Sequence, residues 1–310
     1  MTMASVRHIP SYPEHPAARR RELARAVLAG LVMAGVAGAG GLAQALGLER
    51  SWVDVSHVRL RLPRLGPPFH GYRIAQLSDL HIEWLGGDRL AELVGLVNAL
   101  QPDLIAMTGD YVTATYERVA EDLVPGLSGL RARDGVVAVL GNHDYWGRPG
   151  PGVVLDALRA AGVRDLNNAV FTLERDGDVL HIAGLDSVRA RRHRLDRVLS
   201  ALPTEGTAVL LVHEPDYADV SARTGRFDLQ LSGHSHGGQV VLPFVGPPRL
   251  PPLARKYYDG LYMVGRMLHY TNRGIGTVGL PVRFRCRPEI TLFTLEPAQP
   301  PSQDPPPHPG

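Results

Sequence analysis

The sequence predicts an α/β (α+β) fold in which two β-sheets pack together. Short apolar strands alternate with helices from residue 72 to 161, which indicates a parallel or mixed sheet covered by helices. Residues 170–295 contain many predicted strands and few helices, which indicates a second sheet packed on the first. With 310 residues, 44% of them hydrophobic, the chain is long and apolar enough to bury a substantial core.

The first half of the chain supplies the predicted strand–helix alternation. Loosely alternating apolar residues predict a leading strand within 51–65. Leu90, Leu93 and Val97 recur at helical spacing, and Pro125 predicts a break in the helix that contains it. Together these patterns predict buried strands at 72–77, 104–107 and 136–140, and helices at 88–100, 117–130 and 151–161.

The second half is predicted to consist mainly of strands. Apolar runs at 170–173 and 179–183 flank the turn residues 175–178 and predict a hairpin. Further strands are predicted at 209–212, 229–232, 240–242, 257–264, 267–270 and 290–295. The folded domain is therefore expected over 72–297, preceded by a linker and leading strand at 47–71. The Pro-rich tail 298–310 is predicted to be disordered.

Charge and cysteine content exclude several functional classes. The formal net charge is +2, so no nucleic-acid partner is implied. Cys286 is the only cysteine, which excludes an intrachain disulfide and a metal site built on several thiolates. The sequence does not define the oligomeric state.

The N-terminus predicts export or membrane attachment. After a leader at 1–18 that we expect to be disordered, segment 19–46 begins with three consecutive arginines and ends in the uncharged run 27–46. That run could span the ~30 Å hydrocarbon layer as a helix, with the folded domain outside. The sequence Ala43-Gln44-Ala45 fits a signal-peptidase site, and the arginines loosely resemble a twin-arginine signal. Cleaved signal peptide and retained anchor both stay open, and a buried helix is disfavoured because the run is glycine-rich.

Five polar clusters follow predicted strands, and their residue types are those that bind a pair of first-row metals. Taken alone, Asp-x-His or Gly-Asp would more often be a turn and a single histidine an ordinary core residue, whereas the two longer motifs are rarer. Their shared placement at strand ends indicates one site, because open α/β sheets gather ligands there. The clusters are Asp79-Leu80-His81, Gly109-Asp110, Gly141-Asn142-His143-Asp144, His213, and Gly233-His234-Ser235-His236.

The predicted ligands favour two divalent transition metals. Seven side chains offer only nitrogen and oxygen, a set that suits Mn, Fe or Zn better than Ca or Mg. The seven predicted ligands are Asp79, His81, Asp110, Asn142, His213, His234 and His236. Two divalent ions and two aspartates leave a charge of about +2, and a bridging hydroxide lowers it to about +1, which still attracts a phosphate oxyanion.

The same clusters predict a hydrolytic mechanism. A hydroxide between the two ions would attack phosphorus, because paired metals activate water and hold the displaced oxygens. His143 exceeds the ligand count, so we expect it to act as the general acid for the departing alkoxide, with Asp144 orienting its ring. Arg273 is a candidate phosphate contact, and a structural ion pair is an equally good interpretation of it.

The complete series of motifs resembles the calcineurin-like metallophosphoesterase superfamily. The resemblance covers residues 72–295 and implies a four-layer αββα sandwich, with two mixed sheets flanked by helices and a dinuclear site at the carboxyl ends of strands. It implies one ion held by Asp79, His81, Asp110 and His236, and a second held by Asp110, Asn142, His213 and His234. It also implies that His143 is the catalytic histidine.

A narrower resemblance is to the exported bacterial phosphodiesterase (YaeI-like) branch. It is carried by the N-terminal signal, by 76–81, by Gly237-Gly238-Gln239, and by Asn272-Arg273-Gly274 with Leu280-Pro281-Val282-Arg283. Purple acid phosphatases are disfavoured, because Thr113 stands where they have a tyrosine three residues after the bridging aspartate.

The resulting expectation is a metal-dependent phosphodiesterase. A phosphomonoesterase or a nucleotide or UDP-sugar pyrophosphatase on the same scaffold stays open, and so does a catalytically silent phosphate-binding protein. The expected substrate is a small phosphoester or a lipid-linked one, the latter because residues 27–46 would contact the membrane if they are not cleaved.

Overall fold

Two six-stranded sheets form the centre of the protein, which is described here as a computed structural model over residues 49–113, 116–146 and 150–298. The first sheet has the order β1-β12-β2-β3-β4-β5, and the second has the order β10-β11-β9-β8-β7-β6. Both are mixed, because parallel pairs such as β2–β3 and β8–β9 adjoin antiparallel pairs such as β12–β2 and β10–β11. The predicted class is therefore confirmed.

The strands of the first sheet come from both ends of the described chain. They are β1 (Asp54–Leu62), β2 (Arg73–Leu77), β3 (Leu104–Met107), β4 (Val136–Ala138), β5 (Arg164–Asp165) and β12 (Glu289–Pro297). The prediction counted residues 290–295 among the strands of the second sheet, which is wrong. In the structure β12 lies between β1 and β2, so the leading strand is an integral part of this sheet.

The strands of the second sheet are continuous in sequence. They are β6 (Ala169–Arg175), β7 (Asp178–Gly184), β8 (Thr207–Leu211), β9 (Leu229–Ser232), β10 (Gly260–Val264) and β11 (Met267–Thr271). The predicted hairpin is β6–β7. The strand predicted at 240–242 is wrong: Val240 and Leu242 form only isolated bridges, because Pro243, Pro247 and Pro248 lack the amide donors that a strand needs.

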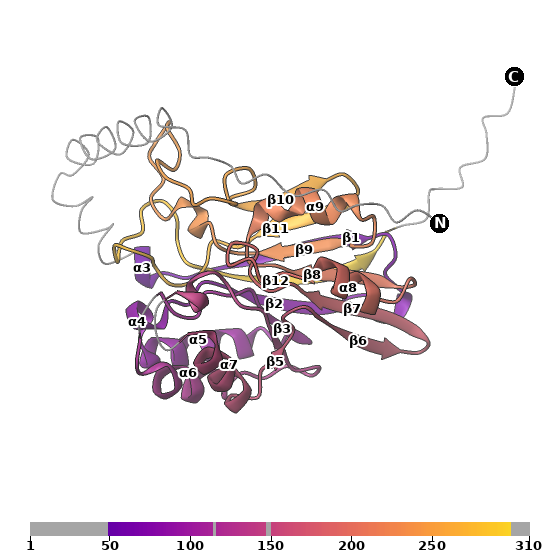
Figure 1. Cartoon of the computed structure of the whole chain (residues 1–310), viewed down its shortest axis with the longest axis horizontal. Coiled ribbons are helices and arrows are strands. Elements are labelled where there is room, and N and C mark those ends of the chain that lie inside the picture. Colours follow the sequence, from indigo (N-terminus) through magenta and orange to yellow (C-terminus); the bar gives the residue numbers. More distant parts are fainter. Residues whose placement is uncertain (1–48, 114–115, 147–149, 299–310) are drawn as a thin grey trace, which may run out of the picture.

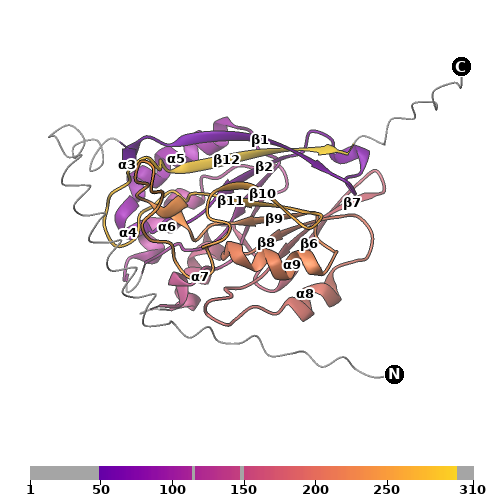
Figure 2. The same ribbon diagram turned by 90° about the horizontal axis from the view of Figure 1, so that it is seen from above.

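Helices cover the outer face of each sheet and complete four layers (Figures 1 and 2). On the first sheet lie α4 (Ile82–Leu85), α5 (Gly87–Ala99), α6 (Val119–Leu127) and α7 (Pro151–Ala160); on the second lie α8 (Leu195–Ala201) and α9 (Ala218–Arg223), which were not predicted. The predicted break at Pro125 is wrong, because α6 continues to Leu127. The two-residue extension costs little, since only the bond to one carbonyl is lost near the helix end.

Three apolar clusters hold the layers together. One lies between the first sheet and its helices, one between the two sheets, and one between the second sheet and α8 and α9. Leu60, Ile74, Val209 and Phe293 are fully buried in the cluster between the sheets. This interface fixes one sheet against the other, so loops from both sheets can share one site.

Several predictions concern residues that the structure does not describe. The leader 1–18, segment 19–46 and residues 299–310 lie outside the described residues. Ala298, the first residue of the predicted tail, donates its amide to Leu62. Among the described residues, no helix has both the length and the hydropathy needed to cross a membrane.

Candidate metal centre

The predicted ligands meet where strands of both sheets end. Asp79 and Asp110 follow β2 and β3, Asn142 comes four residues after β4, and His213 and His234 follow β8 and β9. The structure groups the ionisable ligands into two sets, each with ligand atoms within 4.8 Å of one another. One set is Asp79, His81 and His236, and the other is Asp110, His213 and His234.

The spacing between ligand atoms fits a shared ion. Two ligand atoms about 2.0–2.1 Å from one metal lie about 2.9–3.4 Å apart for octahedral to tetrahedral angles. The distances are 3.2 Å from His81 Nε2 to His236 Nε2 and 3.3 Å from His236 Nε2 to Asp79 Oδ1. In the second set they are 3.0 Å from His213 Nε2 to Asp110 Oδ2 and 3.2 Å from His213 Nε2 to His234 Nδ1.

Asp110 is placed to serve both sets. Its Oδ2 atom lies 3.0 Å from His213 Nε2 and 3.9 Å from His81 Nε2, which belong to different sets. Its other oxygen, Oδ1, accepts the backbone amide of His143 at 2.8 Å. One carboxylate oxygen is thus held by the backbone, and the other faces the region between the sets, as a bridging ligand requires.

The backbone is strained at the ligands. Five of the seven have φ between 44° and 70°, a region that costs free energy for any side chain other than glycine: Asp79, His81, Asp110, His234 and His236. Gly141 and Gly233 permit the close approach, because a Cβ atom at these positions would overlap the carboxylates of Asp110 and Asp79 respectively. Such strain is typical of functional sites and is not visible in a sequence pattern.

Hydrogen bonds orient three of the four histidines. His213 Nδ1 donates to Thr108 O at 2.7 Å, and His234 Nε2 donates to Pro252 O at 2.9 Å. His81 Nδ1 lies 3.0 Å from Thr113 Oγ1. When each ring is neutral, the nitrogen that faces the other ligands therefore has a lone pair, which is the arrangement normally found around metal-binding histidines.

Asn142 provides independent support for a metal. Its side chain is fully buried, and neither its Oδ1 nor its Nδ2 atom has a hydrogen-bond partner. Leaving a buried amide unpaired costs about 1–3 kcal/mol, so this group needs a ligand that the protein does not supply. A metal ion bound to Oδ1 would give the carbonyl oxygen the partner it lacks, and Asn142 remains a predicted ligand.

Four groups of the metal-free centre already favour the protonation states that metals require. Burial opposes ionisation of Asp110, but the nearby His213 keeps the pKa of this carboxyl well below its usual range, and His236 does the same for Asp79. Burial lowers the pKa of His81 to about 3 and that of His234 to about 4. His213 is the exception, because Asp110 and Asp79 outweigh burial and raise its pKa.

His143 lies beside the two sets without joining them. Its ring is 5.1 Å from that of His81, measured between centroids, and its Nδ1 donates to the Thr113 carbonyl at 2.6 Å. Its Nε2 atom is therefore the nitrogen available to a substrate. Trp146 packs against the same ring at 4.4 Å. Sequence reasoning missed the role of Thr113, since a backbone carbonyl leaves no trace in a motif.

The expected role of Asp144 in orienting His143 is wrong. The Asp144 carboxylate instead accepts four backbone amides, two on each oxygen, while His143 is oriented by Thr113. The donors are Asp110 and Gly141 to Oδ2, and Tyr111 and Val112 to Oδ1. Burial and the neighbouring Asp110 raise the pKa of Asp144 to about 8, although the backbone amides act in the opposite direction. We take it to be ionised, because the donors occupy both oxygens and leave no position for a proton. Asp144 therefore holds the loops of Asp110 and Asn142 together.

Arg273 forms ion pairs, which supports the structural interpretation of this residue. Its guanidinium lies 3.3 Å from Glu289 and 3.4 Å from Asp54.

Arg283, quoted above only as part of a motif, is fully buried and donates to the carbonyls of Arg273, Gly274, Gly276 and Cys286. Its Nη2 atom also lies 3.5 Å from His236 Nδ1. Arg283 thus supports the segment behind Asp79 and His236.

Comparisons with known proteins agree with this geometry. A family model described as calcineurin-like phosphoesterase matches residues 72–238, a range that contains all five clusters. The uncharacterized metallophosphoesterase YkuE of Bacillus subtilis is 34% identical over 281 residues, which cover 89% of this chain and 97% of that protein. Phosphodiesterase YaeI of Escherichia coli is 30% identical over 250 residues, which cover 80% and 90%. A transmembrane protein with metallophosphoesterase domain from Danio rerio is 32% identical over 262 residues, which cover 79% and 57%. The chain therefore belongs to the calcineurin-like phosphoesterase family, and it is a metal-dependent phosphoric ester hydrolase.

Proposed function

We propose that this protein is a phosphodiesterase that uses two transition-metal ions, with Mn, Fe or Zn as the candidates. The observation that carries the proposal is the pair of ligand sets that share Asp110, and the buried, unpaired amide of Asn142 supports it. When bound, the two ions would supply the activated water and offset the negative charge of the phosphoryl group.

His143 supplies the proton that the leaving group needs. Because its Nδ1–H is held by the Thr113 carbonyl, the protonated ring can donate only from Nε2. As the bond from phosphorus to the departing oxygen breaks, that oxygen takes the Nε2 proton and leaves as an alcohol. The ring is half-buried and wedged against Trp146, so it can meet a substrate without a large rearrangement.

The charge of the site favours a diester over a monoester. A diester carries one negative charge on its phosphoryl group, and a monoester carries up to two. The ligands leave the centre with only a small positive surplus, and Arg273, which could have matched a second charge, is already paired with Glu289 and Asp54. A singly charged phosphoryl group therefore fits the available charge better.

An assay with paired chromogenic substrates tests this proposal. Purified protein loaded with Mn²⁺ is expected to hydrolyse bis-p-nitrophenyl phosphate with a higher kcat/KM than p-nitrophenyl phosphate. His143→Ala should slow the diester reaction while both ions stay bound, whereas His70→Ala, at an exposed residue outside the centre, should behave like the wild type. A clear preference for the monoester would overturn the diester assignment.

A further inference from the structure

All three tryptophans of the chain are exposed to solvent. Trp52 is 61% exposed, Trp84 41% and Trp146 40%. Tryptophan is usually among the most buried residues on average, so exposure of every one of them requires an explanation. Exposed tryptophans are common where a protein meets the boundary between water and lipid, because the ring is apolar and its N–H can still find a polar partner.

The tryptophans share the edge of the molecule that carries the metal centre. The backbone amide of Trp84 donates to the carbonyl of His81 at 2.9 Å, and Trp146 packs on His143. Trp52 lies under the guanidinium of Arg287 at 4.0 Å. Arg287 adjoins Cys286, whose thiol donates to the carbonyl of His236 at 3.1 Å. Each tryptophan is thus connected to a residue of the centre.

Two loops add apolar side chains at the same edge. Phe244 is fully exposed, Val245 is 62% exposed and Leu280 is 71% exposed. Gln239, three residues after His236, donates its side-chain amide to Leu280 O at 2.9 Å. Figure 1 shows that the loops that follow β9 and β11 gather at the end of the sheets where α3 (Glu49–Ser51) and α4 lie. We call the set Trp52, Trp84, Trp146, Phe244, Val245 and Leu280 the apolar rim.

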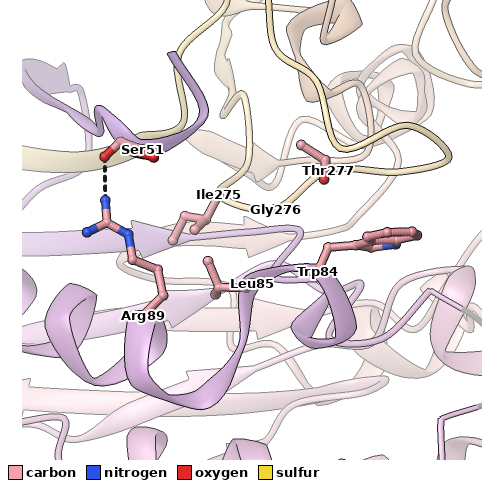
Figure 3. Close-up of a pocket in the computed structure, with 7 residues that line it drawn as sticks. All are labelled: Ser51, Trp84, Leu85, Arg89, Ile275, Gly276 and Thr277. Atoms are coloured by element: carbon pink, nitrogen blue, oxygen red, sulfur yellow. Dashed lines mark hydrogen bonds between the residues drawn. The ribbon is translucent and has the colours of Figure 1, made fainter. Parts of the chain in front are cut away.

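A cavity lies between Ser51, near the start of the described residues, and the segment 275–277, which is bonded to the loop that bears Asp79 and His81. It has a volume of about 190 Å³ and lies between Ser51, Trp84, Arg89 and the segment 275–277 (Figure 3). The amides of Ile275 and Gly276 donate to the carbonyls of Ser78 and Asp79, so the cavity is on the reverse side of the loop that bears Asp79 and His81. The chain therefore enters the domain next to the centre.

The sequence before this entry point indicates what covers the rim. The uncharged apolar run 27–46 ends three residues before Glu49, which is buried and accepts the backbone amide of Arg285. A membrane held by that run would therefore lie near the rim. Exposed Arg249 and Arg285 are in the same loops as Phe244 and Leu280, and arginine beside aromatic residues favours an anionic lipid surface.

We propose that the apolar rim docks on the surface of an anionic lipid bilayer, so that the metal centre faces the lipid headgroups. Docking itself depends only on the rim. Its consequence rests on the proposed function: the substrates would be phosphodiesters held in the bilayer, which reach the centre without leaving it.

Intrinsic fluorescence tests the docking directly, since the only tryptophans are rim residues. The full chain is bound to vesicles of phosphatidylglycerol and phosphatidylcholine, with either ordinary or brominated acyl chains. Docking predicts that emission falls by about half or more with the brominated lipid, because bromine quenches only rings that reach the acyl boundary. Equal emission with both lipids would overturn the proposal even if the chain remained attached to the vesicles.

Two pairs of substitutions distinguish docking by the apolar rim from unspecific adsorption of the protein to the vesicles. Phe244→Ser with Leu280→Ser should reduce the quenching at least about twofold. Leu96→Ser with Met263→Ser removes two apolar side chains that are also exposed but lie outside the rim, and should leave the quenching unchanged. Equal effects of the two pairs would contradict docking by the rim, and so would a lipid-independent dimer that buries the tryptophans. A wild-type protein without diesterase activity would refute the proposed function, but it would not change the tryptophan quenching that reports docking.

Discussion

Replacing Asp144 by asparagine separates two roles for this carboxylate. The structure assigns it to four backbone amides, whereas the sequence pattern assigned it to His143. Asparagine has nearly the same shape but only one oxygen. Each oxygen of Asp144 accepts two backbone N–H groups. Whichever way the asparagine amide is turned, its NH₂ group therefore faces two of these donors, and two hydrogen bonds are lost.

The expected cost follows from those lost bonds. Hydrogen bonds to a charged group contribute about 1.5–3 kcal/mol each, so two of them amount to about 3–6 kcal/mol. The neutral side chain also removes a buried charge next to Asp110, which offsets part of this loss. We therefore expect a net destabilisation of about 2–4 kcal/mol, less than the about 5–15 kcal/mol that a domain normally has, so the variant should still fold.

The assay compares unfolding, metal binding and turnover in one variant. Urea unfolding with chelator present should report the destabilisation, and titration with Mn²⁺ should show weaker binding because the loops of Asp110 and Asn142 are less firmly held. Asp186→Asn provides a control at another buried carboxylate, which accepts the Tyr145 hydroxyl and one amide. If Asp144→Asn unfolds within about 1 kcal/mol of the wild type and binds Mn²⁺ normally, yet turns over as slowly as His143→Ala, our reasoning is refuted.

Three further changes test other parts of the account. His143→Ala should lower kcat about 10²-fold or more with two ions still bound, as metal analysis of the same sample would show; loss of an ion would make His143 a ligand instead. Arg283→Lys should cost about 2–4 kcal/mol in urea unfolding, because one ammonium group cannot reach all the carbonyls that the buried guanidinium satisfies; a neutral result would contradict its supporting role. The metal-free protein should lose thermal stability as the pH falls from about 6.5 to about 4, since the folded state keeps His81 and His234 neutral with pKa values of about 3 and about 4 while the unfolded state takes up protons below about 6.5. A melting temperature that is constant over this range, measured with chelator present, would contradict that assignment.

The sequence predicted the strands of the centre well because their burial leaves a clear pattern. Buried strands such as 104–107 are uninterrupted apolar runs, and the polar residues that follow them mark where each strand ends. The position of β12 between β1 and β2 could not be predicted, since pairing between distant segments depends on the whole fold.

Side-chain identity also predicted which residues meet, but not what each one contacts. Asp144 and Thr113 act through backbone amides and carbonyls, and any sequence has those groups everywhere. Arg273 matched phosphate as well as carboxylate in chemistry, and only the positions of Glu289 and Asp54 decide between them. The strained backbone of the ligands is likewise a property of the assembled site.

Two ligand sets that hold two adjacent ions should be visible by anomalous diffraction from manganese-loaded crystals. We expect two peaks about 3.5–4 Å apart, one among Asp79, His81 and His236 and the other among Asp110, His213 and His234. A single peak at full occupancy, or peaks away from these residues, would contradict this expectation.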